Sequence, residues 1–440
     1  MQTWCLNMDR IALKHLKEWK NKKNRKPLII QGARQVGKTW LMKEFGRQEY
    51  KKVVYVSFDR NESLKSTFTN TVDTSVLISA LEIDSGIKIT AKDTLIILDE
   101  IQECPEALTT LKYFNENAPE FHILVAGSLL GVSLHKGTGF PVGKVDFMTL
   151  YPLNFIEFLN AIGEGRFSKI IEEKNYELIS SFAEKITYLL KHYYYIGGMP
   201  EVVQNYVNDK DYNEVRKLQE NIIISYEQDF SKHTSPYMAE KIRGLWNSIP
   251  SQLAKENKKF VYGAIKQGAR AKEYEEGINW LRDSGLIYKV NRITKPDLPI
   301  KAYEDLEAFK LYLMDVGLLG ALSNLSAKTI IDGDRIFTEF KGSLTEQYVL
   351  QQLKSESKKS VNYWTSRSNV AELDFVVQID NDVVPIEVKA ETNLKAKSLA
   401  QYRKEYNPAK VVRTSLANFK IDDGLYNIPL YMIGQLESIL

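Results

Sequence analysis

The stretch "PLIIQGARQVGKTWLMKEF", residues 27–45, decides the fold of the N-terminal part of the chain. It reads as a short apolar strand, a loop with the spacing G-x-x-x-x-G-K-T, and an amphipathic helix with Leu41, Met42 and Phe45 on one side. Glycines allow such a loop to curl so that successive backbone N–H groups face phosphate oxygens at the helix N-terminus. The loop residues expected to bind the phosphates of a nucleotide are Gly32, Ala33, Arg34, Gln35, Val36, Gly37, Lys38 and Thr39.

A second apolar strand, "DTLIILDEIQ" at 93–102, ends in Asp99 and Glu100. After a phosphate-binding loop, this pattern predicts that Mg²⁺ is held by the Thr39 hydroxyl and, through water, by Asp99, while Lys38 reaches the β- and γ-phosphate oxygens. Glu100 is then placed to polarise the attacking water, which favours a hydrolase over a P-loop kinase of a small acceptor. The simpler alternative is a strand that is capped by two acids.

Two further apolar runs, "KKVVYVSFD" at 51–59 and "FHILVAGSLLG" at 121–131, are typical of buried strands. Strands that alternate with helices predict an α/β domain with a parallel sheet and right-handed crossovers. Gly127-Ser128 ends the strand predicted in the second run, at the sheet edge where such folds bind ligands, so Ser128 is a candidate sensor of the γ-phosphate. A plain Gly-Ser turn is the alternative.

Length and composition indicate a folded, multidomain chain. Its 440 residues exceed what one hydrophobic core supports, and its hydrophobic content of 44% and charged content of 26% are close to globular averages. No apolar run is long enough for a membrane span and the charged N-terminus does not resemble a signal peptide, so we expect a cytoplasmic protein without membrane contact. Cys5 and Cys104 suggest neither a disulfide framework nor a cysteine metal site.

Charge leaves the macromolecular partner open. The net charge of +3 and the pI near 8.4 are below what marks a nucleic-acid-binding domain by itself. A basic segment precedes the first strand and is more typical of a solvated helix end than of a phosphate contact. Its members are Lys17, Lys20, Lys22, Lys23, Arg25 and Lys26.

Five segments in this order resemble a large prokaryotic family of predicted AAA-type ATPases fused to a C-terminal domain of unknown function: "GARQVGKT", "LIILDEIQ", "VAGSLLG", "YPLNFIEFL" (151–159) and "YIGGMPEVV" (195–203). The resemblance covers nearly the whole chain and implies ATP on the glycine loop, Asp99 and Glu100 as Walker B residues, and Ser128 as a sensor. One departure is Gly143-Lys144, where the family usually has Gly-Arg; Lys144 keeps the charge but loses the bidentate guanidinium.

The middle of the chain is expected to be helical and then to form a winged helix. Tyrosines at helical spacing before "GGMP" (197–200) are interpreted as core residues, and Pro200 predicts a bend there. This bend resembles a turn of related signalling ATPases that contacts nucleotide. Downstream, a second helix with Ile278, Trp280 and Leu281 precedes the strand "GLIYKV" (285–290). Its balanced charges favour protein contact over DNA reading.

The C-terminal third carries a second group of candidate site residues. Glu346 falls on the apolar stripe of a predicted helix, where a carboxylate requires a partner. In "AELDFVVQIDNDVVPIEVKA" (371–390), a two-residue turn at Asp380-Asn381 would make the numbers of opposing residues sum to 761 and would place Asp374 opposite Glu387. Lys389 lies on the same face.

In this order Glu346, Asp374 and Glu387-x-Lys389 resemble the restriction-endonuclease-like pattern, in which acids hold Mg²⁺ and the lysine assists catalysis. The resemblance implies Asp374 and Glu387 as metal ligands and all four residues as catalytic. The alternatives are a solvated amphipathic hairpin and an inert binding module of the same fold. Gln401 and Tyr402 are near the place of an extra catalytic glutamine in some relatives, but their spacing departs.

The predicted fold class is α/β: an AAA-like parallel-sheet P-loop core at 1–150, a helical lid at 151–235, a winged helix at 236–300 and an α/β restriction-endonuclease-like domain at 301–440. The favoured function is an ATPase, with ATP and Mg²⁺ as cofactors, whose nucleotide state controls a nuclease-like domain that acts on or binds nucleic acid. The alternative is a regulatory ATP switch with an inert nuclease-like fold, which binds protein partners. A homo-oligomer is compatible with both hypotheses.

Overall fold

A computed structural model describes residues 9–127, 140–255, 258–327, 340–356, 360–367, 371–392 and 396–440. The chain divides into two compact units. The P-loop unit comprises Asp9–Tyr151 together with Asp283–Leu286, and the C-terminal unit comprises Pro152–Arg282 together with Ile287–Leu440. No helix within the described ranges is long and apolar enough to cross a membrane.

The P-loop unit alternates strands and helices, as the sequence predicts. Its helices are α1 (Ile11–Lys20), α2 (Lys38–Glu49), α3 (Glu62–Asn70), α4 (Thr74–Ser85), the 3₁₀ turn η1 (Ile101–Glu103) and α5 (Pro105–Asn117). Its strands are β1 (Leu28–Gln31), β2 (Lys52–Ser57), β3 (Thr94–Asp99), β4 (His122–Ala126) and β5 (Asp146–Thr149). Among the described residues these strands form a five-stranded parallel sheet in the order β2-β3-β4-β1-β5, which confirms the predicted parallel-sheet core.

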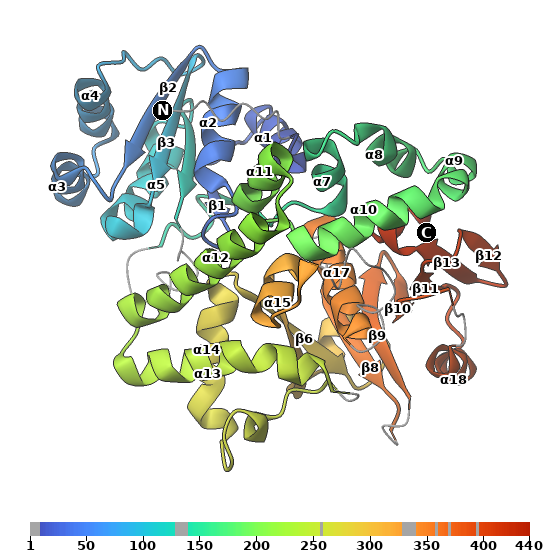
Figure 1. The fold of residues 1–440 in the computed structure, drawn as a ribbon. Helices are drawn as coiled ribbons and strands as arrows, with labels where there is room; N and C mark the ends of the chain where they lie inside the picture. The colour runs from blue at the N-terminus through green and yellow to red at the C-terminus, as the bar shows by residue number, and fades with distance from the viewer. Residues whose placement is uncertain are drawn as a thin grey trace. The chain divides into compact units, whose positions relative to one another are not determined.

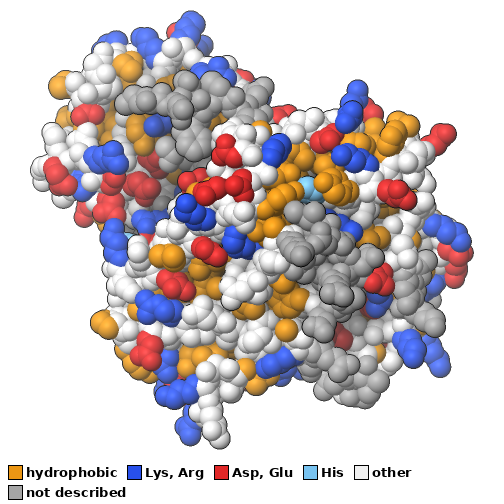
Figure 2. All heavy atoms as spheres, viewed as in Figure 1, with side chains coloured by type: hydrophobic (Ala, Val, Ile, Leu, Met, Phe, Trp, Pro, Cys, Tyr) orange, Lys and Arg blue, Asp and Glu red, His pale blue; other side chains and the backbone are white. Residues whose placement is uncertain are grey.

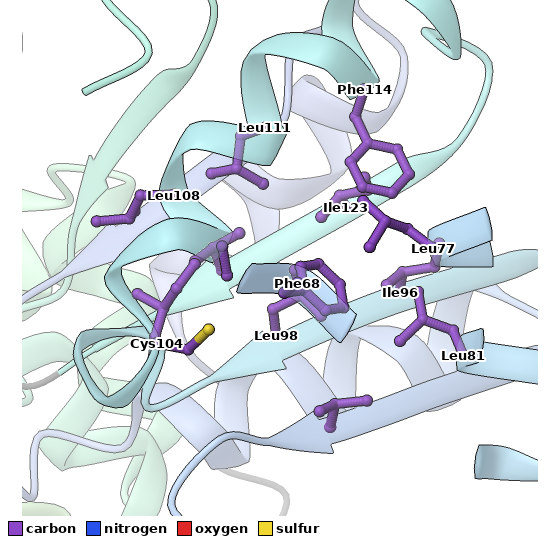
Figure 3. Close-up of a cluster of buried hydrophobic side chains, with 14 of the residues drawn as sticks. Phe68, Leu77, Leu81, Ile96, Leu98, Cys104, Leu108, Leu111, Phe114 and Ile123 are labelled. Atoms are coloured by element: carbon purple, nitrogen blue, oxygen red, sulfur yellow. The ribbon is translucent and has the colours of Figure 1, made fainter. Parts of the chain in front are cut away.

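Helices cover both faces of this sheet (Figure 1). On one face, α3, α4 and α5 pack on β3 and β4 through an apolar cluster that includes Phe68, Leu98 and Phe114, all almost fully buried (Figure 3). On the other face α2 lies against β2 and β3, where a Cβ at Gly46 would lie 2.6 Å from Cγ2 of Val53. The predicted inward residues of α2, Leu41, Met42 and Phe45, are fully buried. Because helices bury both faces of the sheet, the strand ends that carry the phosphate loop are held in place.

The C-terminal unit begins with a helical segment. Its helices are α7 (Phe155–Ala161), α8 (Gly165–Glu172), α9 (Tyr176–Ser181), α10 (Ala183–Ile196), α11 (Pro200–Asp209), α12 (Tyr212–His233), α13 (Pro236–Leu253) and α14 (Ala271–Asp283), with the 3₁₀ turn η2 (Tyr262–Ala264) before α14. Tyr193, Tyr194 and Tyr195 are buried, which confirms their interpretation as core residues. The expected bend lies between α10 and α11, where Met199 has extended backbone angles before Pro200.

The remaining elements build a mixed sheet and its covering helices. The strands are β6 (Ile287–Ile293), β7 (Glu304–Leu313), β8 (Val361–Thr365), β9 (Glu372–Ile379), β10 (Asp382–Val388), β11 (Val411–Ser415), β12 (Lys420–Asp422) and β13 (Leu425–Pro429). The helices are η3 (Ile300–Tyr303), α15 (Val316–Leu322), α17 (Lys341–Glu356), α18 (Lys397–Tyr406), η4 (Leu430–Gln435) and α19 (Leu436–Ile439). Within the described ranges the strands form one eight-stranded sheet in the order β12-β13-β11-β10-β9-β8-β6-β7.

This sheet crosses a predicted domain boundary. The strand expected after the second helix of the winged-helix segment is β6, which pairs with β7 as an antiparallel hairpin and with β8 in parallel. Residues on both sides of position 300 therefore share one sheet, and the division of the chain into four domains stays a prediction. Helix α14 buries Ile278, Trp280 and Leu281 as expected, while Glu273 on its outer side pairs with Lys241 of α13 at 3.0 Å.

Candidate functional sites

The phosphate loop has the shape that its glycines predict. It runs from the end of β1 to Lys38, the first residue of α2, and Gly32 has a φ of 146°. A Cβ at Gly32 would lie 2.3 Å from the backbone oxygen of Leu150, so only glycine fits here. The buried Lys38 Nζ donates hydrogen bonds to the backbone oxygens of Gly32 (2.8 Å) and Ala33 (2.7 Å). The ammonium group thus lies over the loop.

The acids at the end of β3 face this loop. The Thr39 hydroxyl donates a hydrogen bond to Asp99 Oδ2 at 2.6 Å, which brings together the two oxygens expected to hold Mg²⁺. Tyr55, on the neighbouring β2, donates its hydroxyl to the same Asp99 oxygen at 3.2 Å, and Gln102 Nε2 donates to Glu100 Oε2 at 2.5 Å. Sequence reasoning missed Tyr55 and Gln102. The available signals were a tyrosine in the strand next to the acids and an amide directly after them.

Burial sets the electrostatics of this site. Removal of water lowers the pKa of Lys38 to about 8, although Glu100 and Asp99 act in the opposite direction. Burial likewise raises the pKa of Asp99 above its ordinary value, against the hydrogen bond from Thr39. An ammonium group that has lost much of its hydration gains strongly from an anionic partner. The site is therefore suited to receive negatively charged phosphate oxygens.

A distant segment completes the loop surroundings. Gly285, in the turn between α14 and β6, belongs to the P-loop unit and has a φ of 76°. A Cβ at this position would lie 3.1 Å from the backbone nitrogen of Ala33. The backbone of residues 283–286 thus approaches the backbone of the phosphate loop, a contact for which the sequence offered no signal.

Ser128, the candidate sensor, lies outside the described residues.

The lysines singled out in the P-loop unit pair with other residues of this unit. Lys144, at the departure from the family pattern, pairs with Glu116 at 2.9 Å. In the basic N-terminal segment, Lys20 pairs with Glu49 and Lys22 with Asp146, and Lys26 donates to the backbone oxygen of Gly143. These contacts agree with a structural role for the segment.

In the C-terminal unit, Glu346 is buried on α17 as predicted, and both of its oxygens have partners. Lys258 Nζ, from the segment after α13, donates to Oε1 and pairs with the carboxylate. The Tyr312 hydroxyl, on β7, donates to Oε2 at 3.0 Å. Burial alone would raise the pKa of Glu346, but Lys258, Lys310 and Tyr312 together lower it below its ordinary value. Glu346 is therefore a stabilised, charged carboxylate.

The β9–β10 hairpin has the predicted register. Asp382 pairs with Ile379 and Ile386 with Phe375, so opposing residue numbers sum to 761. The ladder stops one pair short of Asp374 and Glu387. The residues of the predicted apolar face are all buried: Leu373, Phe375, Val377, Ile379, Val384, Ile386 and Val388.

At this end of the hairpin the carboxylates take on different partners. Asp374 Oδ2 accepts a hydrogen bond from the Val388 N–H at 2.7 Å. Lys389 Nζ pairs with Glu387 Oε1 at 2.6 Å, while the buried Oε2 of Glu387 has no hydrogen-bond partner among the described residues. Burial, with nearby Glu346 and Glu387, raises the pKa of Asp374 well above its ordinary value. Burial also raises the pKa of Glu387, against the influence of Lys389.

A third ion pair lies beside these groups. Lys310, fully buried on β7, donates to Glu372 Oε1 at 2.5 Å. We refer to the whole set as the C-terminal charge cluster: Glu346, Glu372, Asp374, Glu387, Lys258, Lys310 and Lys389. Sequence reasoning missed Lys258, Lys310, Tyr312 and Glu372. Lys310 and Tyr312 had one signal, because they interrupt an otherwise apolar strand.

The charge cluster does not gather a metal-binding set as it stands. Within the described ranges, no group of three or more His, Cys, Asp and Glu side chains is arranged to hold a metal ion. The third acid that a divalent site would need, Glu346, is held by Lys258 and Tyr312. Tyr402 is buried against Trp364 and Tyr406 and contributes to the core, while Gln401 is exposed.

A hydrogen-bond network connects the bend at 197–200 to α17. The Gly198 N–H donates to Asp315 Oδ2 at 2.6 Å, and Gln351 Nε2, on α17, donates to the same oxygen at 3.1 Å. A Cβ at Gly197 would lie 2.2 Å from Asp315 Oδ1, so glycine is required there as well. Burial raises the pKa of Asp315 against these hydrogen bonds. Nucleotide contact by this bend stays a prediction.

Charge is mixed on the face of the molecule that Figure 2 shows. Figure 2 shows Lys and Arg side chains interspersed with Asp and Glu over the described residues of this face, without a continuous basic area.

Comparisons with known proteins agree with the geometry of the P-loop unit. Residues 24–159 match a family model described as "AAA domain". Residues 187–329 and 341–433 match two domains of unknown function, DUF8612 and DUF4143. No curated protein matches the chain. Residues 24–159 are therefore similar to AAA domains, in agreement with the P-loop geometry of this unit.

The solved structures that match the chain have low sequence identity and TM-scores below 0.5. The Walker-type ATPase PABY2304 of Pyrococcus abyssi is 13% identical with a TM-score of 0.46, over 72% of this chain and 96% of that chain. Orc1 of Aeropyrum pernix in complex with DNA is 12% identical with a TM-score of 0.27, over 71% and 91% of the two chains. AMPPCP-bound DnaA of Aquifex aeolicus is 16% identical with a TM-score of 0.28, over 63% and 88%.

Proposed function

We propose that this protein is an ATP-hydrolysing AAA protein whose nucleotide state controls a C-terminal nuclease-like domain that acts on or binds nucleic acid. The observation that carries the ATPase part is the 2.6 Å hydrogen bond from the Thr39 hydroxyl to Asp99, with Lys38 over the adjoining loop. These three groups are the hydroxyl, acid and ammonium that phosphoryl transfer requires.

The oxygens at this site fit Mg²⁺. Thr39 Oγ1 and Asp99 Oδ2 are hard donors that already converge, and the pKa of Asp99 is raised by burial, as is expected where a cation would relieve excess negative charge. When bound, Mg²⁺ would neutralise charge on the β- and γ-phosphate oxygens. Thr39 would hold the ion directly and Asp99 through water.

The other roles in ATP hydrolysis are carried out by protein side chains. Lys38 exchanges its backbone acceptors on Gly32 and Ala33 for phosphate oxygens, where its charge stabilises the transferring group. Glu100 accepts the proton of the attacking water, and Gln102 fixes the direction of that carboxylate. Asp99 keeps the Thr39 hydroxyl oriented.

One contact, and the course of the chain after it, support control by the nucleotide. Residues 283–286 approach the phosphate loop at Ala33, and they lead directly into β6 of the eight-stranded sheet. A change in the loop backbone on nucleotide binding would displace Gly285, because the two backbones leave no free space. This is the route that we propose from the nucleotide site to the C-terminal unit.

The nuclease-like part rests on the end of the β9–β10 hairpin. Asp374 and Glu387 follow the last ladder pair, Lys389 pairs with Glu387, and Glu387 Oε2 is buried without a partner. A buried carboxylate oxygen without a hydrogen bond is rare and calls for a ligand. Since the cluster gathers no three-acid set as it stands, we derive no metal-dependent step from it.

A second function is favoured by a specific observation. The pairing of Glu346 with Lys258 and Tyr312 satisfies the third acid internally, as expected of an inert nuclease-like fold. In that case the protein is a regulatory ATP switch, and the C-terminal unit binds protein partners without cleavage.

A cleavage assay separates the two functions. Single- and double-stranded DNA and RNA are incubated with Mg²⁺ or Mn²⁺, with and without ATP, and wild type is compared with Glu387→Ala and Lys38→Ala. Cleavage that Glu387→Ala abolishes supports the nuclease-like function, and its response to Lys38→Ala reports control by ATP. No cleavage under any condition, with ATP still bound, supports the switch.

A further inference from the structure

Arg10, at the start of α1, connects two backbone segments of the P-loop unit. The residue is only 3% exposed, which is unusual for a side chain that is always charged. Its Nη1 donates a hydrogen bond to the backbone oxygen of Val36 at 3.3 Å, and its Nη2 donates to that of Tyr151 at 2.7 Å. The guanidinium group therefore bridges the phosphate loop and the segment that follows β5.

The bridge acts on one peptide group of the loop. A loop that presents its N–H groups to phosphate turns the carbonyl groups of the same peptides away, because the C=O and N–H bonds of a trans peptide point in opposite directions. The Val36 carbonyl belongs to the same peptide group as the Gly37 N–H. A donor that holds this carbonyl therefore also fixes the direction of the Gly37 N–H, and it polarises that N–H toward an anion.

Two buried cations share the carbonyl groups of the loop. Lys38 Nζ donates to the carbonyl oxygens of Gly32 and Ala33, and Arg10 donates to that of Val36. In the proposed hydrolysis, Lys38 leaves its carbonyl groups for phosphate oxygens. Arg10 is also bonded to Tyr151 within the same unit, so it stays in place. The Val36 carbonyl thus keeps its donor while Lys38 moves.

We infer that Arg10 is a positioning residue of the nucleotide site: it holds the Val36 carbonyl so that the Gly37 N–H is directed at a phosphate group of the bound nucleotide. This inference rests on the proposed function, because it takes the loop as the ATP site. Arginine fits the role since its planar fork of N–H donors reaches two acceptors at once, whereas lysine offers a point charge without this fork.

Two measurements on the full chain test the inference: calorimetry of ATP binding in EDTA, and steady-state ATP hydrolysis with Mg²⁺. Arg10→Met removes the guanidinium group and keeps an unbranched apolar side chain. We expect ATP to bind about tenfold more weakly, since one hydrogen bond from the loop is misdirected. This bond is made in the ground state and in the transition state alike, so KM should rise by the same factor while kcat changes less than about threefold.

Arg25→Met is the matched control. Arg25 also donates to backbone carbonyl groups of the P-loop unit, those of Lys20, Pro119 and Glu120, so its loss should leave the affinity for ATP unchanged. Arg10→Lys should recover only part of the affinity, because the charge is kept but the fork is lost. Guanidinium ion at millimolar concentration should raise the affinity of Arg10→Ala for ATP, while sodium ion at the same ionic strength should not.

Several outcomes would overturn the inference. Wild-type affinity and KM in folded Arg10→Met contradict it, and so does full recovery in Arg10→Lys, which would show that positive charge alone matters. A fall in kcat with unchanged KM contradicts it as well, because Arg10 would then act on the chemical step alone. If wild type binds no ATP, the proposed function fails and the inference fails with it, which distinguishes this outcome from a failure of the inference alone.

A milder substitution covers the case in which Arg10→Met does not fold. Arg10→Lys is then compared with Arg25→Lys and with wild type in the same binding experiment. Weaker ATP binding in Arg10→Lys alone supports the inference, and equal binding in all three proteins overturns it.

Discussion

The nucleotide site and the C-terminal charge cluster are built in different ways. The phosphate loop is one contiguous segment between β1 and α2, and its shape is set by backbone conformation and by a glycine that packs against Leu150. The charge cluster draws on four separate parts of the chain: the segment after α13, β7, α17 and the β9–β10 hairpin. Removal of a side chain from a site shaped by the backbone changes the folding free energy little. Removal of one partner from a buried ion pair lowers the folding free energy strongly.

The largest effect is expected from Lys310→Met. Lys310 is fully buried, and its loss leaves Glu372 without its cation beside Glu346 and Asp374. Breaking a buried pair from one side typically costs about 3–5 kcal/mol of folding free energy, and we expect the lower end because Glu372 is 27% exposed. Urea unfolding of the C-terminal transition measures it.

The control is Lys295→Met, an exposed lysine whose loss should be nearly neutral. The double variant Lys310→Met/Glu372→Gln should recover part of the stability, since no unpaired charge remains. Equal stability of Lys310→Met and wild type would show that the cluster is not held by its ion pairs, and the contrast with the phosphate loop would fail.

Lys38→Ala is expected to show the opposite behaviour. The loop backbone keeps its shape, so the unfolding midpoint changes little, but a charge aimed at the transferring phosphoryl group is lost. Removal of one such group reduces turnover by about 10²–10³-fold. ATP hydrolysis and ATP-induced thermal stabilisation are measured in parallel with Lys51→Ala, an exposed lysine at the start of the same sheet. Hydrolysis at the wild-type rate in Lys38→Ala would refute the assignment of the site.

The same contrast explains how much the sequence could predict. The nucleotide site was predictable because its spacing is local: a glycine loop, a helix start and an acid after an apolar strand are each read within about ten residues. Glu346, Asp374, Glu387 and Lys389 could also be proposed, because the hairpin register follows from its turn. Their partners could not be predicted, since Lys258 and Lys310 are brought to the acids only by the tertiary packing of β7 and α17.

Glu356, a second acid on α17, is buried without a cation beside it among the groups that set its pKa. Burial, with Glu157, Glu172 and Glu437 nearby, raises the pKa of Glu356 to about 8, from an ordinary value of 4.5. The folded state therefore retains a proton that the unfolded state releases, so its stability is full below about pH 4.5 and falls as the pH rises through about 8.

Glu356→Gln keeps the acceptor for the Asn154 amide and should remove this pH dependence. At about pH 9 the variant should be more stable than wild type by on the order of 2–4 kcal/mol, and at about pH 4 the two should be equal. Unfolding by urea across this pH range measures the difference. A parallel loss of stability in both proteins would contradict the raised pKa of Glu356.

The smallest effect is expected from Tyr312→Phe, which removes one of the two donors to Glu346 and leaves the ring in place. A hydrogen bond to a charged group contributes about 1.5–3 kcal/mol, and we expect about 1–2 kcal/mol because Lys258 still pairs with the carboxylate. Tyr237→Phe, at an exposed tyrosine, is the matched control and should be neutral. The unfolding free energy measures both variants.

The informative quantity is the coupling between Tyr312 and Lys258. If both groups stabilise the same charged carboxylate, removal of one makes the other more important, and the double variant Tyr312→Phe/Lys258→Met deviates from additivity by more than about 0.5 kcal/mol. A smaller loss of stability on Tyr312→Phe in the Lys258→Met background than in wild type would mean that Glu346 takes up a proton once Lys258 is gone, so the Tyr312 hydroxyl no longer meets a charge. Additive effects would mean that the two donors act independently. The sign and size of this coupling energy therefore show whether charge interactions or packing alone stabilise the cluster. Stabilisation by charge would distinguish the cluster from the phosphate loop, whose shape is set by its backbone.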